Sequence, residues 1–347
     1  MKRDITKHLE NVKAIIDRHQ LGRTGAYCRW LWQPADPNKP RRQLGINEYG
    51  CADAANTLYM IGAFPADAAE RQEWIDTLQS LQHPDTGLFV EETHHTTHTT
   101  AHCIAALELF EQKALHPLTA LQKYRNKDEL YKLLDGLEWT VNPWLASHQG
   151  AGIYAAMVLQ GEVDTEWENW YFDWFWNEED PETGFWRKDK VVLISEGDSF
   201  SGKLPFPTIF PHLAGTFHYL FNHEYAHRPL RYPEQMIDTC LNILENNLWV
   251  TLGRAVSFAE IDWVYCMTRA MRQTPYKFEE GKAALRKFAE RYLDYLDSLD
   301  PMTDDGLNDL HTLFGSVCCL AELQSALPGE ITSAKPLKLV LDRRPFI

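Results

Sequence analysis

Two kinds of helical segment alternate along the chain. The first kind carries bulky apolar residues at helical spacing on one face, with polar residues between them. It occurs six times, at residues 5–16, 74–81, 130–137, 167–174, 237–248 and 285–296. Each of these segments predicts an amphipathic helix that packs one face against a core.

The second kind of segment lies between the first and combines a polar start with small residues. These segments begin near six positions, with spacings of 47, 50, 64, 48 and 49 residues, namely Cys51, His98, His148, His212, Glu260 and Asp309. Small residues such as Ala105, Gly152 and Gly215 leave room for the close approach of two backbones. A regular period of this size is the signature of a repeat architecture.

The alternation predicts an all-α fold built from six helical hairpins. If every second helix lies inside, the inner helices run parallel and their first turns meet at one face. We expect residues 1–330 to form this single domain, and residues 331–347, which contain Pro336 and Pro345, to pack as a tail on its outside. The longest spacing contains residues 187–203, which we expect to form a long loop over the site.

Two turns in the chain are similar to the glycine–aromatic turn of cyclase-type proteins, QHPDTGLF at residues 82–89 and DPETGFW at residues 180–186. In both we expect a glycine with positive φ and an aromatic residue anchored in the core. Together with the repeat, they make the chain resemble the α/α-toroid proteins. That group includes six-hairpin glycosidases, sugar 2-epimerases, polysaccharide lyases, terpenoid cyclases and prenyltransferases. The resemblance implies an (α/α)6 toroid whose site lies where the inner ring of parallel helices begins.

Charge and composition narrow the class of partner. The net charge of −15 disfavours binding to nucleic acid or to an anionic membrane. No apolar run approaches the roughly 20 residues of a membrane span, and the charged N-terminus does not resemble a secretory signal, so we expect a cytoplasmic protein. The seven cysteines, with Cys318 and Cys319 adjacent, suit no disulfide framework. The 12 Trp, 14 Tyr and 16 Phe suit a site that stacks sugar rings or one that encloses an apolar ligand, and composition does not separate the two. We expect a small-molecule or oligosaccharide substrate.

Histidines gather at the starts of the small-residue segments. Eight of the 14 lie there, namely His94, His95, His98, His102, His148, His212, His218 and His311. Histidine is the side chain whose pKa lies nearest neutral pH, so such a ring suits proton transfer. His94, His98 and His102 are four residues apart and on one helix would share a face that can bind zinc. Because no H-E-x-x-H motif is present, we expect neither a metal nor a cofactor.

Four carboxylates are candidate catalytic groups. Asp262 lies in the apolar run FAEIDWVY, where a carboxylate is costly to bury without partners. We therefore rank it first as an acid, with a buried salt bridge to Arg254 or Arg269 as the alternative. Asp53 and Asp309 are each either a catalytic base or a helix N-cap. Glu260, at the start of the same segment as Asp262, is the fourth candidate.

Aromatic, histidine and amide side chains near the same segment starts are candidates for substrate binding. For stacking on a sugar ring we select Trp144, Trp186 and Tyr265. For hydrogen bonds to hydroxyl groups we select His98, His148, Gln149 and His212. Arg254 is the candidate that would neutralise a substrate carboxylate.

Motif absences exclude several reaction classes, and three hypotheses follow. The chain has no GxGxxG, Walker or GxSxG motif, and it lacks the DxDD and DDxxD motifs of terpenoid cyclases. The leading hypothesis is a glycoside hydrolase acting on short oligosaccharides, including those with uronic acids, with Asp262 as acid and Asp53 or Asp309 as base. The second is a sugar epimerase or polysaccharide lyase with His98, His148 or His212 as base. The third is a toroid that binds a ligand without catalysis.

Overall fold

The chain is mostly helical, as predicted. A computed structural model describes residues 2–140, 142–192 and 209–346, and within these ranges it contains twelve α-helices. The two strands in these ranges are short, β1 (Arg3–Asp4) and β2 (Ile331–Thr332), and they pair in parallel. Of the long loop expected over the site, residues 193–203 lie outside the described ranges.

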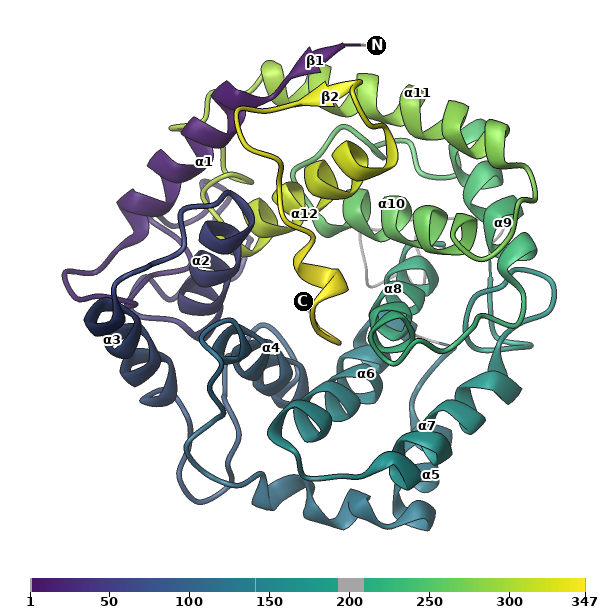
Figure 1. The fold of residues 1–347 in the computed structure, drawn as a ribbon, viewed down its shortest axis with the longest axis horizontal. Helices are drawn as coiled ribbons and strands as arrows, with labels where there is room; N and C mark the ends of the chain where they lie inside the picture. The colour runs from purple at the N-terminus through teal and green to yellow at the C-terminus, as the bar shows by residue number, and fades with distance from the viewer. Residues whose placement is uncertain (1, 141, 193–208, 347) are drawn as a thin grey trace.

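Six helices form the interior, and nearly every described residue in them is buried. Each contacts the next along the chain, and the last contacts the first, so their contacts form a closed cycle (Figure 1). They correspond to the predicted small-residue segments: α2 (Glu48–Met60), α4 (Thr96–Glu108), α6 (Pro143–Gln160), α8 (Ile209–Tyr225), α10 (Phe258–Met271) and α12 (Leu310–Ala326).

Six further helices lie around this interior (Figure 1). Each buries one face, as the apolar spacing predicted; in the last of them the buried residues include Leu285, Phe288, Tyr292 and Leu296. These helices are α1 (Thr6–His19), α3 (Ala68–Gln79), α5 (Lys127–Gly136), α7 (Thr165–Glu178), α9 (Pro233–Glu245) and α11 (Phe278–Asp297). Two 3-10 helices complete the described elements, η1 (Thr119–Arg125) and η3 (Val340–Asp342).

Polar residues at the starts of the inner helices act partly as caps. The side chain of Asn47 accepts from the N–H groups of Tyr49 and Gly50 at the start of α2. Asp309 accepts from the N–H of His311 at the start of α12, which confirms the cap interpretation for this residue. Asp53 lies inside α2 and is not a cap.

Glycines allow the inner helices to approach one another and the loops to turn. A Cβ atom on Gly152 would lie 2.9 Å from the carbonyl oxygen of Thr97 on α4, so only glycine permits this approach of α6. Gly87 and Gly184 have φ of 73° and 70°, and the side chains of Phe89 and Phe185 are fully buried beside them. Both turns therefore have the predicted positive φ and core aromatic.

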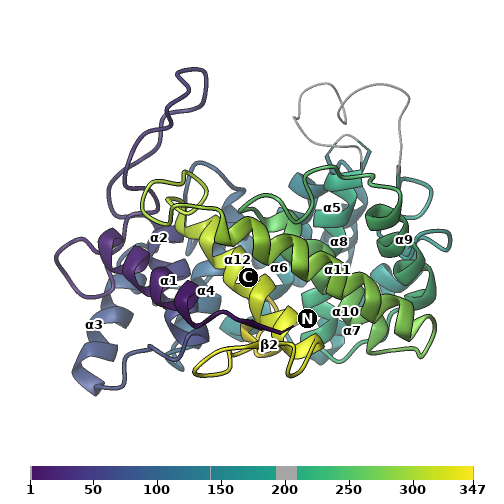
Figure 2. The same ribbon diagram turned by 90° about the horizontal axis from the view of Figure 1, so that it is seen from above.

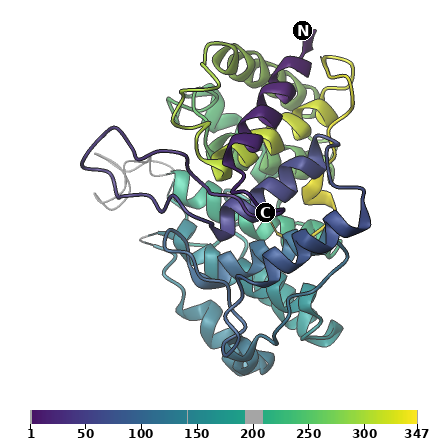
Figure 3. The same ribbon diagram turned by 90° about the vertical axis from the view of Figure 1, so that its left-hand side faces the viewer.

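The end of the C-terminal tail, residues 340–346, is largely buried inside the molecule, whereas most of residues 332–338 are exposed; the prediction that residues 331–347 pack on the outside is therefore wrong for the end of the tail. The tail runs inward between the inner helices, with the C label near the middle of the helices in Figure 1 and near the middle of the molecule in the two side views (Figures 2 and 3). Phe346 is fully buried and packs against His98 and Phe221, with ring centroids 4.7 and 5.2 Å away. The buried Arg344 donates to the carbonyl oxygen of Ala105 at 2.7 Å. The small inner residues leave space at the ring centre, and the tail fills it.

The connection between α1 and α2, residues 20–47, extends beyond the helices on one side of the molecule (Figures 2 and 3). The strand β2, which leads into the tail, lies on the opposite side (Figure 2). Among the described residues no helix has both the length and the apolar character needed to span a membrane.

Candidate functional site

A cavity of about 300 Å³ lies at the starts of the inner helices, where the sequence predicts the site. Its lining combines histidines, aromatic rings and a single carboxyl group. The lining residues are Arg29, Thr93, His94, His98, Trp144, His148, Phe210, His218, Trp249, Ser257, Phe258, Asp262, His311 and Thr312. They come from five of the six inner helices and from the loops that precede them.

Asp262 supplies the carboxyl group of the cavity wall, and this group has no hydrogen-bond partner among the described residues. Its side chain is 1 % exposed, and neither carboxyl oxygen has a hydrogen-bond partner among the described residues. Burial raises the pKa of Asp262 well above its usual value of 3.8, and nearby Glu260 raises it further. Burial therefore favours the protonated, uncharged form of this carboxyl group, and in that form it can donate a proton.

The salt-bridge alternative for Asp262 does not match the contacts observed. Arg269 is paired with Glu322 at 2.6 Å and with Asp342 at 2.7 Å. Arg254 is exposed and does not line the cavity, so it is not placed to neutralise a substrate carboxylate there. An unpaired buried carboxyl group is costly for stability, and such groups cluster at functional sites.

We expect Asp262→Asn to become steadily more stable relative to the natural protein as the pH rises above 3.8. In that range the native carboxyl keeps its proton while the unfolded one loses it, so the natural protein loses stability as pH rises, by about 1.4 kcal/mol per pH unit. The asparagine side chain does not titrate and escapes this loss. Urea unfolding of both proteins at several pH values measures the difference, with the exposed Asp85→Asn as control. Parallel pH profiles for the Asp262 pair would contradict the assignment.

The other three carboxylates of the prediction do not line the cavity. Asp309 is paired with the guanidinium of Arg29 through contacts of 2.8 and 3.0 Å, in addition to capping α12. Glu260 accepts from the N–H of Gly253 at 3.1 Å and from the hydroxyl of Ser257 at 2.6 Å. Burial raises the pKa of Glu260 to about 7, although these hydrogen bonds lower it. Both groups are engaged in holding local structure.

Asp53 lies behind the cavity and holds one of its histidines. Its carboxylate contacts Nε2 of His102 at 2.8 Å and Nδ1 of His311 at 3.1 Å. Burial raises the pKa of Asp53, but His311 and His102 outweigh burial and hold the pKa below its usual range. When Nδ1–H of His311 donates to this carboxylate, Nε2 of the neutral ring is left as an acceptor. His311 itself lines the cavity.

Arg29 carries a positive charge in the cavity wall, and neighbouring carboxylates balance it. Besides Asp309, its guanidinium lies 3.6 Å from Glu91, and it donates to the hydroxyl of Thr93 at 2.8 Å. Burial raises the pKa of Glu91, but its bonds to His94 and Thr93 and the charge of Arg29 lower it to about 2. The wall therefore offers no unbalanced charge for an ionised substrate.

Two groups of side chains have ligand atoms close enough to hold a metal ion. One is His98, His148 and His218, and the other is Asp53, His102 and His311; in each group the ligand atoms lie within 4.8 Å of one another. His94, His98 and His102, whose four-residue spacing was considered for zinc, do not form one of these groups. His98 and His102, both on α4, belong to different groups, and residues of other helices complete each group.

Of the predicted binding residues, His98, His148 and Trp144 line the cavity, and the others do not. Trp186 is fully buried in the core and donates from Nε1 to the carbonyl oxygen of Phe175. Tyr265 is also fully buried, with the guanidinium of Arg269 3.9 Å from its ring centroid. Gln149 and His212 are on α6 and α8 but outside the cavity lining, and Nε2 of His212 accepts from the N–H of Val192.

Several lining residues were missed because their signal is weak in the sequence. Arg29, Phe210 and Trp249 stand in or next to loops, and no periodicity marks them. His218 was noted among the histidines near segment starts but was not selected, and in the structure it is in the middle of α8. His311 was noted among the histidines at segment starts but was not selected, although it follows Asp309 by only two residues.

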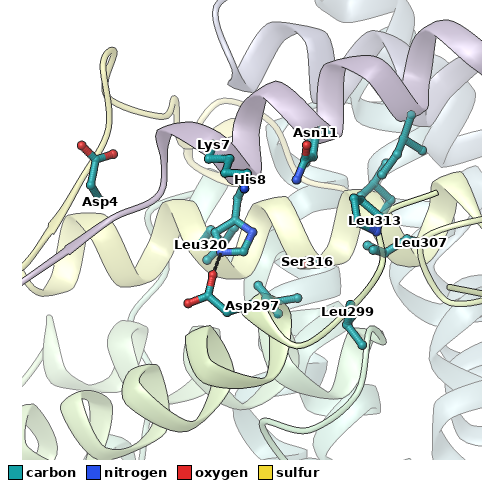
Figure 4. Close-up of a pocket in the computed structure, with 14 residues that line it drawn as sticks. Asp4, Lys7, His8, Asn11, Asp297, Leu299, Leu307, Leu313, Ser316 and Leu320 are labelled. Carbon is teal, nitrogen blue, oxygen red and sulfur yellow. Dashed lines mark ion pairs between the residues drawn. The ribbon is translucent and has the colours of Figure 1, made fainter. Parts of the chain in front are cut away.

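A second cavity of about 350 Å³ lies between α1, α11 and α12 (Figure 4). Its polar lining consists mainly of Asp4, Lys7, His8, Asn11 and Asp297, and His8 pairs with Asp297 at 2.9 Å. The hydroxyl of Ser316, also in its wall, accepts from Tyr292 at 2.7 Å. This pocket has no counterpart of the unpartnered carboxyl and imidazole groups of the first cavity, so the first cavity is the stronger candidate site.

The arrangement of groups in that cavity is consequently the basis for assigning a function. It joins an uncharged acid on α10, a carboxylate-held histidine on α12 and three clustered histidines on α4, α6 and α8. Compared with protein-family models, with curated proteins and with solved structures, the chain matches none.

Proposed function

We propose that the helices form an (α/α)6 toroid, with α2, α4, α6, α8, α10 and α12 as its inner ring. The closed cycle of contacts among these helices supports this architecture, as does the alternation of inner and outer helices along the chain. The gathering of inner helix starts at one cavity fits parallel inner helices. In this proposal residues 1–330 make one domain, whose centre receives the tail.

We propose further that the protein is an enzyme that transfers protons on a small uncharged sugar with a carbonyl group, bound in this cavity. One observation carries the proposal: the carboxyl group of Asp262, which has no hydrogen-bond partner among the described residues, shares the cavity with His311, whose ring is bound by Asp53. A carboxylate that orients an imidazole is a common way to prepare a general base. An acid and a base that share one cavity but have different local environments suit general acid–base catalysis.

In the proposed reaction, Nε2 of His311 takes a proton from a carbon next to a carbonyl group. Asp262 donates its hydrogen bond, or its proton, to the carbonyl oxygen, on which negative charge develops. Protonated His311 then returns its proton to the neighbouring carbon, and the hydroxyl group on the first carbon gives its proton to Asp262 as the new carbonyl group forms. The net result is an isomer whose carbonyl group has moved by one carbon, with no carbon–carbon or carbon–oxygen bond cleaved and no cofactor consumed. If a second protonated group on the opposite face returns the proton to the first carbon instead, the product is an epimer.

Hydrolysis is the second candidate, and the cavity supports it less well. A glycosidase needs two carboxyl groups on either side of the scissile bond. Of the four predicted carboxylates only Asp262 lines the cavity, while Asp53, Asp309 and Glu260 are held by other partners. Elimination at a uronic acid is disfavoured because Arg29 is already balanced by Asp309 and Glu91.

The size and lining of the cavity suit a single sugar unit. About 300 Å³ is at the lower end of small-molecule sites, which run from about 300 to 1,000 Å³. Trp144 and Trp249 offer ring faces or edges for the apolar side of a sugar. A polymer would need an open groove, whereas this site is a compact hollow.

The experiment incubates the protein with a panel of aldoses, ketoses and short oligosaccharides in two isotopic solvents, deuterium oxide and water labelled with oxygen-18. In deuterium oxide the natural protein is expected to place deuterium on a carbon of one substrate, detected by mass spectrometry and NMR after exchange of hydroxyl deuterons. His311→Gln and Asp262→Asn are expected to lose this exchange, whereas the exposed His83→Gln and Asp85→Asn retain it.

The outcomes separate the three functional hypotheses. Oxygen-18 from labelled water in a cleaved product would overturn proton transfer in favour of hydrolysis. Cleavage without oxygen-18, with an unsaturated product, would identify a lyase. If folded natural protein transfers neither label to any member of the panel, the enzymatic proposal fails and ligand binding without catalysis is favoured.

A further inference from the structure

We propose that His98, His148 and His218 bind one divalent transition-metal ion at the wall of the cavity. The three side chains come from α4, α6 and α8, and their ligand atoms lie within 4.8 Å of one another. A tetrahedral site with metal–nitrogen distances of about 2.0–2.1 Å has its nitrogens about 3.4 Å apart, so modest side-chain rotations would close it. This inference does not depend on the proton-transfer reaction.

His148 supplies the first independent observation. Its side chain is fully buried, and neither ring nitrogen has a hydrogen-bond partner among the described residues. Leaving a buried polar group unsatisfied is costly, and such groups in native proteins call for an explanation. A metal ion that is bound by the lone pair of one ring nitrogen would satisfy that nitrogen and provide the explanation.

His218 is held in the tautomer that a metal requires. The hydroxyl of Ser147 donates to the carbonyl oxygen of Trp144 at 2.6 Å, so toward Nδ1 of His218, also 2.6 Å away, it acts as an acceptor. Nδ1 of His218 therefore carries the proton, and Nε2 keeps its lone pair. A histidine that binds a metal typically donates its other N–H to such an outer partner.

His98 has a comparable outer partner. Its Nδ1 lies 2.5 Å from the hydroxyl of Tyr49, a group that can accept as well as donate a hydrogen bond. The pair therefore permits the tautomer with a free Nε2. On the other side of the cluster, the ring of Phe346 packs at 4.7 Å from His98 and 6.3 Å from His218. This apolar backing keeps water from the rear of the cluster and fixes the two rings.

The chemistry of three imidazoles selects the class of ion. The three histidines are buried and their ligand atoms converge, and histidine coordinates a metal ion through a ring nitrogen of the neutral imidazole. Neutral imidazole suits Zn²⁺, Co²⁺, Ni²⁺ or Fe²⁺ and is a poor ligand for Mg²⁺ or Ca²⁺. Three protein ligands leave further coordination positions open, and these face the cavity.

The second group, Asp53, His102 and His311, is the weaker candidate. Its ligand atoms already bind one another, since the carboxylate of Asp53 contacts both imidazoles at 2.8 and 3.1 Å. A metal there would have to replace both contacts. The first group has no hydrogen bond among its three members in the part of the chain described, so a metal would replace none.

The test is metal binding by the full-length protein, stripped with a chelator and titrated with Co²⁺ or Zn²⁺ alone. We expect about one equivalent of metal to bind per chain. Calorimetry measures the binding, and the visible absorption of low-coordinate Co²⁺ reports the coordination. His148→Gln and His218→Gln are each expected to weaken binding at least about 100-fold, and Ser147→Ala about 10–100-fold. His311→Gln, in the competing group, and the exposed His83→Gln are expected to leave it unchanged.

Three results would overturn the proposal. The first is a folded natural protein that binds neither ion. The second is unchanged Co²⁺ affinity in both His148→Gln and His218→Gln. The third is loss of binding in His311→Gln with retention in His148→Gln, which would assign the metal to the Asp53 group. Circular dichroism of each variant separates lost binding from lost fold, and Ser147→Ala, which keeps all three ligands, provides the second line of evidence.

Discussion

Replacing Arg269 by methionine is expected to lower the free energy of unfolding by about 3–5 kcal/mol. The guanidinium of Arg269 is fully buried on α10 and binds both carboxylate oxygens of Glu322 on α12, at 2.8 and 2.6 Å. It also binds Asp342 of η3 at 2.7 Å. The substitution leaves Glu322, itself 2 % exposed, as a buried charge without its partner. That uncompensated charge is the source of the loss.

Urea unfolding of Arg269→Met and of Arg272→Met measures this effect against a matched control. Arg272 has a side chain that is 40 % exposed and pairs with Glu224 at 3.1 Å and Asp342 at 3.3 Å. Because water solvates an exposed pair, the control is expected to lose less than about 1 kcal/mol. The double variant Arg269→Met/Glu322→Met is expected to recover most of the loss. Equal losses in the two single variants would show that burial does not govern this network.

Replacing Phe346 by alanine is expected to lower the free energy of unfolding by about 3–5 kcal/mol. The ring is fully buried at the centre of the inner helices, between His98 of α4 and His218 and Phe221 of α8. Its removal leaves a cavity that helices already in mutual contact are poorly able to close. A residue next to the end of a chain ordinarily contributes little, so a loss of this size would be specific to the docked tail.

Thermal and urea unfolding of Phe346→Ala test the docked position of the tail. The control is Phe278→Ala on α11, where the side chain is 42 % exposed and the expected loss is below about 1 kcal/mol. Because Phe346 backs His98 and His218, the variant is also expected to weaken Co²⁺ binding. Unchanged stability in Phe346→Ala would contradict the placement of the tail inside the ring.

The amino-acid sequence by itself was enough to predict the helices and to place the candidate site at the starts of the inner helices. Bulky apolar residues such as Leu285, Phe288 and Tyr292 recur with the helical period. The small residues of α4 and α6 indicate helices that approach their neighbours closely. These are local properties, because a helix follows from the residues within it and from caps such as Asn47. Regular alternation then indicated which helices lie inside and which ends meet.

Tertiary structure decided which polar residues at that face are available for chemistry. In the sequence Asp53, Asp262 and Asp309 all lie near the start of a small-residue segment, and only the apolar run around Asp262 sets that residue apart. In the structure His102 and His311 hold Asp53, Arg29 pairs with Asp309, and Asp262 has no partner among the described residues. These pairings join residues 49 to 280 positions apart, so no local pattern reveals them.

The tail and the clustered histidines depended on tertiary structure in the same way. Residues 331–347 are rich in charge and contain two prolines, which is typical of an exposed segment, yet Phe346 and Arg344 are fully buried. His218 joins His98 and His148 because α8 packs against α6, and α6 against α4. Sequence periodicity shows that a helix has a buried face. Which residues contact that face depends on the packing of neighbouring helices, because burial and pairing involve side chains from distant parts of the chain.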